Sequence, residues 1–203
     1  MLVGGSLYID TEKTYNTYGL VLQEKDPRNN TTTYNYDTFN LYSATTTNHL
    51  GHTQTSLYDY SVGKPKQIRD ANGFVFQVVY DGLDRVTEEK QPDVMAPTTL
   101  VAKATYVYTD NTFPTHVTKT DYLNSATTTD SHSYFDGLGR TTQERRQAED
   151  TNTYVVMDSV YDVRGLKQKE SLPYFSTGSG RTNATTTNSL YSCLLYTSDA
   201  ADE

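Results

Sequence analysis

The chain has 203 residues, of which 35% are hydrophobic and 12% are aromatic, and its formal net charge is −8. This negative charge argues against a nucleic-acid partner, which needs a basic face to displace counterions from phosphates. No apolar run approaches the roughly 18 residues that span a bilayer, so no membrane span is expected, and the first residues lack the features of a signal peptide.

The composition favours β-strands. Tyrosine dominates the aromatic residues, with 18 Tyr against 6 Phe and no Trp, and threonine is abundant. Branched and aromatic side chains fit a pleated, half-buried surface, and no segment shows convincing helical periodicity. The sequence therefore predicts an all-β protein with a core rich in tyrosine.

The clearest predicted elements form a three-stranded meander over residues 64–92. In its middle strand, residues 74–80, Phe76 and Val78 share one face by the two-residue period. Turns are expected at residues 70–73 and directly after Tyr80, which gives the flanking strands. The predicted strands of the chain are at residues 64–69, 74–80, 86–91, 101–108, 115–121, 153–161 and 166–172.

One phrase recurs along the chain, and a repeat of this kind decides the architecture. The three strong copies are Tyr80-Asp81-Gly82-Leu83-Asp84-Arg85, Tyr134-Phe135-Asp136-Gly137-Leu138-Gly139-Arg140 and Tyr161-Asp162-Val163-Arg164-Gly165-Leu166. Weaker copies start at Tyr36-Asp37, Tyr58-Asp59 and Tyr108-Thr109-Asp110. From Tyr58 onward, the spacing drifts between 22 and 28 residues, as expected for hairpins with loops of varying length.

The phrase predicts a tight turn. Asp at the first position and Gly three residues later are the preferences of a type I β-turn, and Asp84 can replace the Gly because Asp tolerates the left-handed region. The preceding tyrosine should end one strand, and the residues after the arginine should start the next. The residues of this structural turn motif are Tyr80, Asp81, Arg85, Tyr134, Asp136, Gly139, Arg140, Tyr161, Asp162 and Gly165.

The groups that could carry chemistry do not form a convergent set in the sequence. His49 and His52 offer two imidazoles without further metal ligands nearby, and Ser131-His132-Ser133 has no acid positioned by sequence. Glu88 and Glu89 are adjacent on a predicted strand and so point to opposite faces, and Glu149-Asp150 is a similar adjacent pair. No catalytic residue, metal site or cofactor is predicted.

The last eleven residues, Cys193 to Glu203, match the translation of a transposase-type sequencing adaptor at every position. They are therefore expected not to be native. Their removal takes away the only cysteine and three acids, so that the formal net charge changes from −8 to −5. Disulfide and cysteine-nucleophile hypotheses then lose their only candidate.

At the repeated phrases the chain resembles the YD-repeat family, which comprises bacterial Rhs proteins, the C-type subunits of insecticidal toxin complexes and the repeats of animal teneurins. The family phrase, Tyr-Asp-x-x-Gly-Arg, is approached by the three strong copies, and the segment from Ser171 to Phe175 also looks like these proteins. The resemblance is good from about Tyr58 to Phe175 and weak before it. It implies repeated antiparallel β-hairpins forming a curved sheet strip, part of a hollow shell.

In bacterial members of that family, the shell encloses a variable C-terminal toxin domain, which an aspartyl self-cleavage site releases. The Asp-Pro-x-Gly element of that site is not found; Asp26-Pro27-Arg28-Asn29 shares only the first pair and lies at the opposite end. The resemblance also implies a secreted or cell-surface location. The partners it implies are the rest of the same polypeptide shell and an enclosed toxin domain.

Three functions stay open at this point. The first is a structural, encapsulating role without catalysis, with residues 1–57 as weakly matching β repeats, 58–192 as the hairpin array and 193–203 as the adaptor-derived tail. The second is a carbohydrate-binding module, which would stack sugars on an exposed row of tyrosines. The third is a glycoside hydrolase, which would need two carboxylates converging in a pocket.

Overall fold

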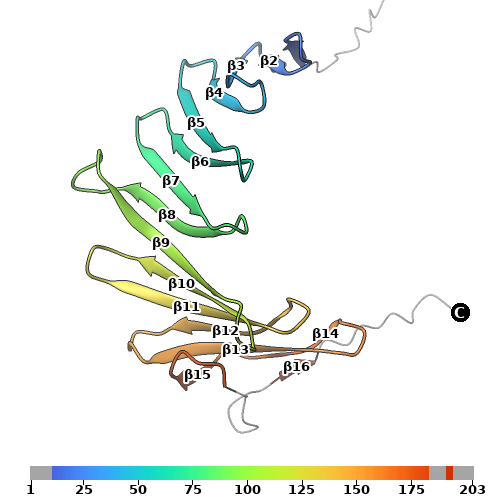
Figure 1. Cartoon of the computed structure of the whole chain (residues 1–203), viewed down its shortest axis with the longest axis vertical. Coiled ribbons are helices and arrows are strands. Elements are labelled where there is room, and N and C mark those ends of the chain that lie inside the picture. The colour runs from blue at the N-terminus through green and yellow to red at the C-terminus, as the bar shows by residue number, and fades with distance from the viewer. Residues whose placement is uncertain (1–10, 183–190, 194–203) are drawn as a thin grey trace, which may run out of the picture. The chain divides into compact units, whose positions relative to one another are not determined.

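The structure is a computed structural model that describes residues 11–182 and 191–193, and every regular element in those ranges is a β-strand (Figure 1). The all-β fold predicted from the sequence is thereby confirmed. The strands are β1 (Glu12–Tyr15), β2 (Val21–Lys25), β3 (Thr31–Tyr36), β4 (Ser43–Thr47), β5 (Thr53–Asp59), β6 (Lys64–Arg69), β7 (Val75–Tyr80), β8 (Val86–Pro92), β9 (Leu100–Thr109), β10 (His116–Tyr122), β11 (Thr128–Phe135), β12 (Thr141–Gln147), β13 (Thr153–Tyr161), β14 (Lys167–Ser171), β15 (Tyr174–Thr177) and β16 (Tyr191–Cys193).

The chain divides into two compact units, residues 1–102 and residues 103–203. In the first unit, each strand from β1 to β7 pairs antiparallel with the next strand along the chain. In the second unit, β9 to β13 pair in the same way. Each unit is therefore a run of consecutive hairpins, and in the first unit this run includes the strands before Tyr58.

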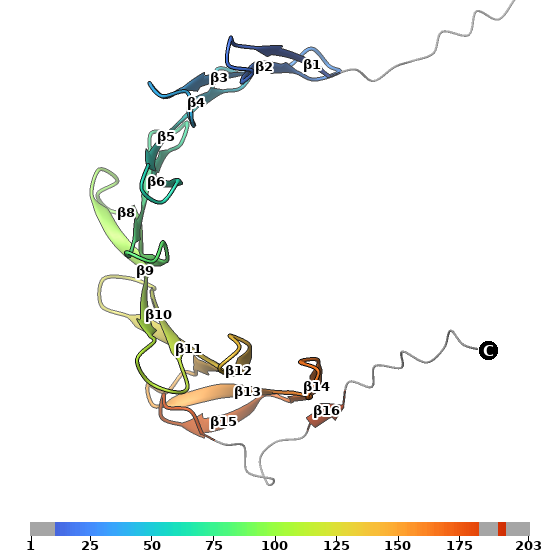
Figure 2. The same cartoon turned by 45° about the vertical axis from the view of Figure 1, so that its right-hand side comes forward.

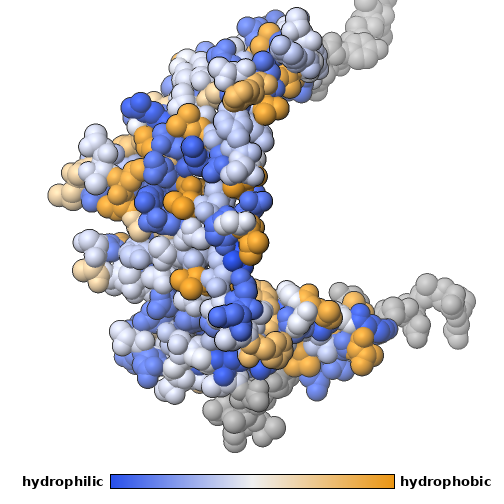
Figure 3. Space-filling view, viewed as in Figure 1, coloured by the Kyte–Doolittle hydropathy of each residue, from blue (hydrophilic) through white to orange (hydrophobic). Residues whose placement is uncertain are grey.

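The first unit is a single-layer sheet. None of the side chains of residues 11–102 is buried, and large apolar side chains such as Leu57 and Phe76 stay exposed on it. Threonines fill much of β3 to β5, where Thr47 and Thr53 hydrogen-bond across the strands at 3.0 Å, a packing that suits branched side chains. The visible face accordingly mixes hydrophilic and hydrophobic residues (Figure 3).

In the second unit the sheet branches at β13. One edge of β13 pairs with β12, whereas the other edge pairs with β15 along Thr153–Val156 and with β14 along Ser159–Tyr161 (Figure 2). The strand β16 then pairs with the free edge of β14.

Most of the buried side chains of the described residues gather on one face of the second unit, and five of the nine are polar or charged. Across β11, β12 and β13, Tyr134, Gln143 and Asp158 stand in one cross-strand row, and His132, Arg145 and Val156 stand in the next. The opposite face carries exposed charges such as Arg146. A tyrosine-rich core was predicted; Tyr134 and Tyr154 belong to it, but they share it with charged and amide side chains.

Two expectations concern residues that the structure describes only in part. The adaptor-derived tail, residues 193–203, lies outside the described residues except for Cys193, whose backbone pairs with Lys169 at the end of β16. The division into weaker repeats before residue 58 and stronger repeats after it rests on the match to the repeated phrase and stays a prediction.

Candidate functional site

The three strong phrases adopt one turn geometry. In the copy at Asp136, the Asp136 N–H donates to the Arg140 carbonyl at 3.0 Å, and the Gly139 N–H donates to the Asp136 carbonyl at 3.0 Å. The Asp136 carboxylate accepts two further backbone N–H groups, from Leu138 at 2.9 Å and from Arg140 at 3.0 Å. Asp81 and Asp162 accept the equivalent bonds in their own turns.

The fourth residue of each turn has a left-handed backbone. The φ angles are +62° at Asp84, +77° at Gly139 and +86° at Gly165. A type I turn followed by a residue in this region is a standard three-residue hairpin connection. It explains why the phrase carries Gly, or once Asp, three residues after the leading aspartate.

The same turn occurs where the sequence has no Tyr-Asp phrase. Its four further copies each begin with Asn or Asp and place Gly or Asn three residues later; they begin at Asn16, Asp26, Asn48 and Asp70. The weaker phrases at Asp37 and Asp59 form looser versions, in which Asn40 and Gly63 donate back to the leading carbonyl. Asp110 directly follows β9. The turn at Asp70 was predicted from the sequence and is confirmed. The other three of the four further copies were missed, and an Asn or Asp with Gly or Asn at the third following position is the signal that would have found them.

The tyrosine of the phrase ties its turn to the preceding turn on the same edge of the sheet. In three repeats its hydroxyl donates to a carbonyl just after that preceding turn, at the start of the neighbouring strand. These bonds are Tyr36 to Val21 at 2.9 Å, Tyr80 to Pro65 at 3.0 Å and Tyr161 to Thr141 at 2.9 Å. The pairing register of each strand shifts at this tyrosine. Such a β-bulge changes the direction in which the side chain at that position points.

The arginine of the phrase makes a second link. Arg140 pairs with Asp136 of its own turn at 2.7 Å, and its guanidinium lies 4.5 Å from the ring centroid of Tyr161 in the next phrase. Such a cation over an aromatic face is attractive. The phrase therefore joins consecutive hairpins: Asp136 shapes the turn, Arg140 neutralises that carboxylate, and Tyr161 lies under Arg140 and donates its hydroxyl to the Thr141 carbonyl after the turn.

The turn carboxylates are more acidic than ordinary aspartates. The backbone N–H of Arg140 lowers the pKa of Asp136 below its usual 3.8, and the side chain of Arg140 adds to this effect. Arg85 lowers the pKa of Asp81 in the same way, and the backbone N–H of Leu166 lowers the pKa of Asp162. Each carboxylate is thus held in its charged, hydrogen-bonding form at neutral pH.

The two glycines of the Asp136 turn should respond differently to a methyl group. Gly139 has φ of +77°, whereas Gly137 has no positive φ, and an added Cβ would meet no atom within 4 Å at either position. Gly139→Ala should therefore destabilise the protein by about 1 kcal/mol through backbone strain alone. Gly137→Ala is the matched control and should be nearly neutral in urea unfolding. Equal losses for the two variants would contradict the turn geometry.

A polar cluster lies on the buried face of the second unit, centred on Arg145, which is fully buried. Its guanidinium donates to Gln143 Oε1 at 3.1 Å. The Gln143 amide in turn donates to Asp158 Oδ1 at 2.7 Å, and the other Asp158 oxygen accepts the Tyr174 hydroxyl at 2.7 Å. This cluster was not predicted, because nothing in the sequence separates Arg145 from its exposed neighbour Arg146.

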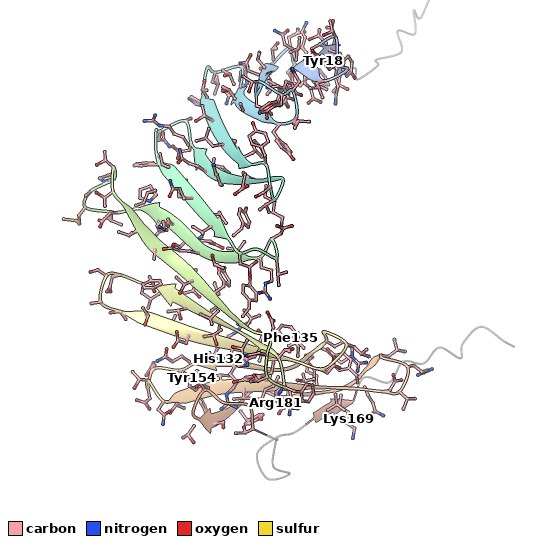
Figure 4. The ribbon with its side chains drawn as sticks, in the orientation of Figure 1. Tyr18, His132, Phe135, Tyr154, Lys169 and Arg181 are labelled. Carbon is pink, nitrogen blue, oxygen red and sulfur yellow. The ribbon has the colours of Figure 1, made fainter. Side chains whose placement is uncertain are left out.

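His132 belongs to the same face and lies beside Tyr154, with ring centroids 5.6 Å apart (Figure 4). Its Nδ1 lies 3.0 Å from the Thr118 hydroxyl, and burial lowers the pKa of His132 below 6.5. Ser131 and Ser133 precede and follow it on the strand, so they point to the other face. The three residues do not form a nucleophile and base together.

The other candidate groups are dispersed. His49 and His52 lie in the turn that begins at Asn48. Glu88 and Glu89 face opposite sides of β8, and Glu149-Asp150 lies between β12 and β13. Within residues 11–182 and 191–193, no three His, Cys, Asp or Glu side chains gather as a metal site would require.

Two depressions open on the sheets. One, of about 310 Å³, lies on the first unit, and Asp59 is the one carboxylate among its lining residues. The other, of about 460 Å³, lies on the second unit and includes Asp121 and Asp130. Lys119 pairs with Asp121 at 2.8 Å, and Asp130 accepts the Thr120 hydroxyl at 2.8 Å. Over the described ranges, no helix is long and apolar enough to cross a membrane.

Comparison with known proteins gives a partial family match. A family model described as a domain of unknown function, DUF6443, matches residues 105–203, which lie within the second unit. No curated protein matches the sequence.

Solved structures share the fold. The crystal structure of TcdB2-TccC3 is 18% identical with a TM-score of 0.68, and 81% of this chain aligns with 11% of that one. The same protein without its hypervariable C-terminal region is 15% identical, with a TM-score of 0.69 and coverages of 81% and 13%. TcdB2-TccC3-Cdc42 is 14% identical, with a TM-score of 0.69 and the same coverages. The chain thus has the fold of a small part of these much longer proteins.

Proposed function

We propose that the chain is a wall segment of a YD-repeat shell, with a structural, encapsulating role and no catalysis of its own. The observation that carries this proposal is the linked row of turns, in which the tyrosine hydroxyl and arginine of one phrase join consecutive hairpins. The fold shared with part of TcdB2-TccC3 supports it. The weaker repeats in residues 1–57 and the array in residues 58–192 are segments of the same wall.

The single-layer sheet supports the same role. A sheet whose two faces are both open, as in residues 11–102, separates two spaces without needing a second layer. Its stability comes from hairpin pairing and from links along the turn edge, so the wall can extend through many repeats. The partners of this segment are then the adjoining repeats of the same polypeptide and an enclosed toxin domain, in a secreted or surface protein.

The proposal is tested on the longest polypeptide that the source gene encodes around residues 11–182, examined by single-particle electron microscopy. We expect a hollow particle in which these residues form part of the wall, and protection of the enclosed region from added protease. A particle without an internal space would overturn the proposal. So would saturable binding of an oligosaccharide by the purified chain, since a carbohydrate-binding module would then be the better reading.

A further inference from the structure

A short segment after β15 crosses the buried face of the second unit. We call residues 177–182 the strap. It begins at a turn in which the Gly178 N–H donates to the Asn152 carbonyl at 2.9 Å. It then runs over β11 and β12, and Arg181 near its end is labelled in Figure 4.

The sheet holds the strap mainly by its main chain. The Tyr134 hydroxyl donates to the Ser179 carbonyl at 2.7 Å, and Arg145 donates to the Gly178 carbonyl at 2.7 Å. The Gln143 amide pairs with both backbone groups of Thr182, donating to its carbonyl at 2.6 Å and accepting its N–H at 3.3 Å. One side chain of the strap, the Thr182 hydroxyl, also accepts from Arg145 at 3.1 Å.

The side chains of the strap contribute little to this contact. Ser179, Arg181 and Thr182 are exposed, and a Cβ added at Gly180 would meet no atom within 4 Å. Gly178 is the exception, because its φ of +78° favours glycine. The surface thus bonds mainly to the main chain of the strap and recognises residues 179–181 with little regard to their side chains.

The side chains that bind the strap also have partners within the sheet. With the strap in place, Tyr134, Gln143 and Arg145 are 5%, 1% and 0% exposed. Asp158 fixes the Gln143 amide, and the Arg145 guanidinium lies 5.7 Å from the ring centroid of Tyr154. Fixed donors of this kind lower the entropic cost of capturing a peptide.

We propose that this face, together with the edge of β13 at Thr153–Val156, is a docking site for an extended peptide, filled here by residues 174–182 of the same chain. The segment docks through two kinds of contact. Its first part, β15, pairs as a strand with the edge of β13, and the main-chain carbonyls of the strap accept hydrogen bonds from side chains of the sheet. Its occupant in trans is the same segment of a second copy of this chain, which fits the site by construction.

The test uses the full chain with residues 174–182 replaced by a Gly-Ser linker of equal length, and a fluorescent peptide spanning residues 174–182. We expect saturable binding by anisotropy. Arg145→Ala in the linker chain should weaken binding by about tenfold or more, since it removes the donor to the strap carbonyls. Arg146→Ala, on the opposite face, is the matched control and should leave affinity unchanged.

Peptides with altered residues test whether the site recognises the main chain of the segment or its side chains. A peptide carrying Ser179→Ala, Gly180→Ala and Arg181→Ala together should bind within about threefold of the original, whereas Gly178→Ala should weaken binding by about tenfold through backbone strain. Loss of binding by the triple variant would overturn the proposal. If the linker chain unfolds, recovery of its circular dichroism on refolding with the peptide supports the site, and failure to recover counts against it.

Discussion

Arg145→Ala is expected to lower the free energy of unfolding by about 3 kcal/mol, because it removes a fully buried side chain and its hydrogen bonds to the strap and to Gln143. The Gly178 carbonyl and Gln143 Oε1 lose a donor, and the strap loses its central contact. Urea unfolding followed by circular dichroism measures the loss.

The neighbouring residue provides the control for this prediction. Arg146 has a side chain that is 78% exposed and pairs with Glu144 at 3.7 Å. Exposed pairs of this kind contribute little, so Arg146→Ala should change stability by less than about 0.5 kcal/mol. Similar losses for the two variants would show that Arg145 is not the anchor of the buried face.

Acid is expected to destabilise the hairpin row sharply. Asp81, Asp136 and Asp162 have pKa values below the ordinary 3.8 in the folded chain, because backbone N–H groups and arginines favour the carboxylate. A lowered folded-state pKa means that the stabilisation is fully present above the unfolded-state value and is lost as pH falls through the folded-state value. Thermal unfolding measured from about pH 5 to about pH 2 should therefore show a steep fall in midpoint.

Substitution by asparagine separates two effects of acid on these turns, the loss of the carboxylate charge and the loss of the turn geometry. Asn16 and Asn48 accept the same two backbone N–H groups without carrying a charge. A chain with Asp81→Asn, Asp136→Asn and Asp162→Asn should keep its turns and lose part of the acid-induced fall, because Asp26, Asp37 and Asp59, whose pKa values are also lowered, remain. If the triple variant falls as steeply as the unaltered chain, the turn carboxylates are not the cause.

The strands and their tight turns are local features, and the sequence predicts them well. The meander at residues 64–92 is present as β6, β7 and β8, because alternation and turn residues act over a few positions. The turns at Asn16, Asp26 and Asn48 were not predicted, because none of them begins with the Tyr-Asp pair of the repeated phrase: Tyr15 precedes an asparagine, and Asp26 and Asn48 have no tyrosine before them. The tyrosine of the phrase is not part of the turn itself; its hydroxyl links neighbouring hairpins.

The polar cluster could not be predicted, because it depends on register and on distant segments. In the run Glu144-Arg145-Arg146, which arginine is buried depends on the register shift between Tyr134 and Phe135, since moving a strand by one residue exchanges its faces. The strap reaches Arg145 from more than thirty residues away. No local pattern in the strand indicates that a later segment will cover it.

The linked turn edge has a consequence for how such proteins change in length. In residues 11–102 no side chain is buried, and the hydroxyls of Tyr36 and Tyr80 bond to the hairpin that precedes each of them. The stability of such an array is close to a sum over hairpins and their nearest neighbours. A gene duplication or deletion of one whole hairpin would then leave the remaining hairpins in unchanged surroundings, so proteins built in this way can change their number of hairpins without a change in a shared core.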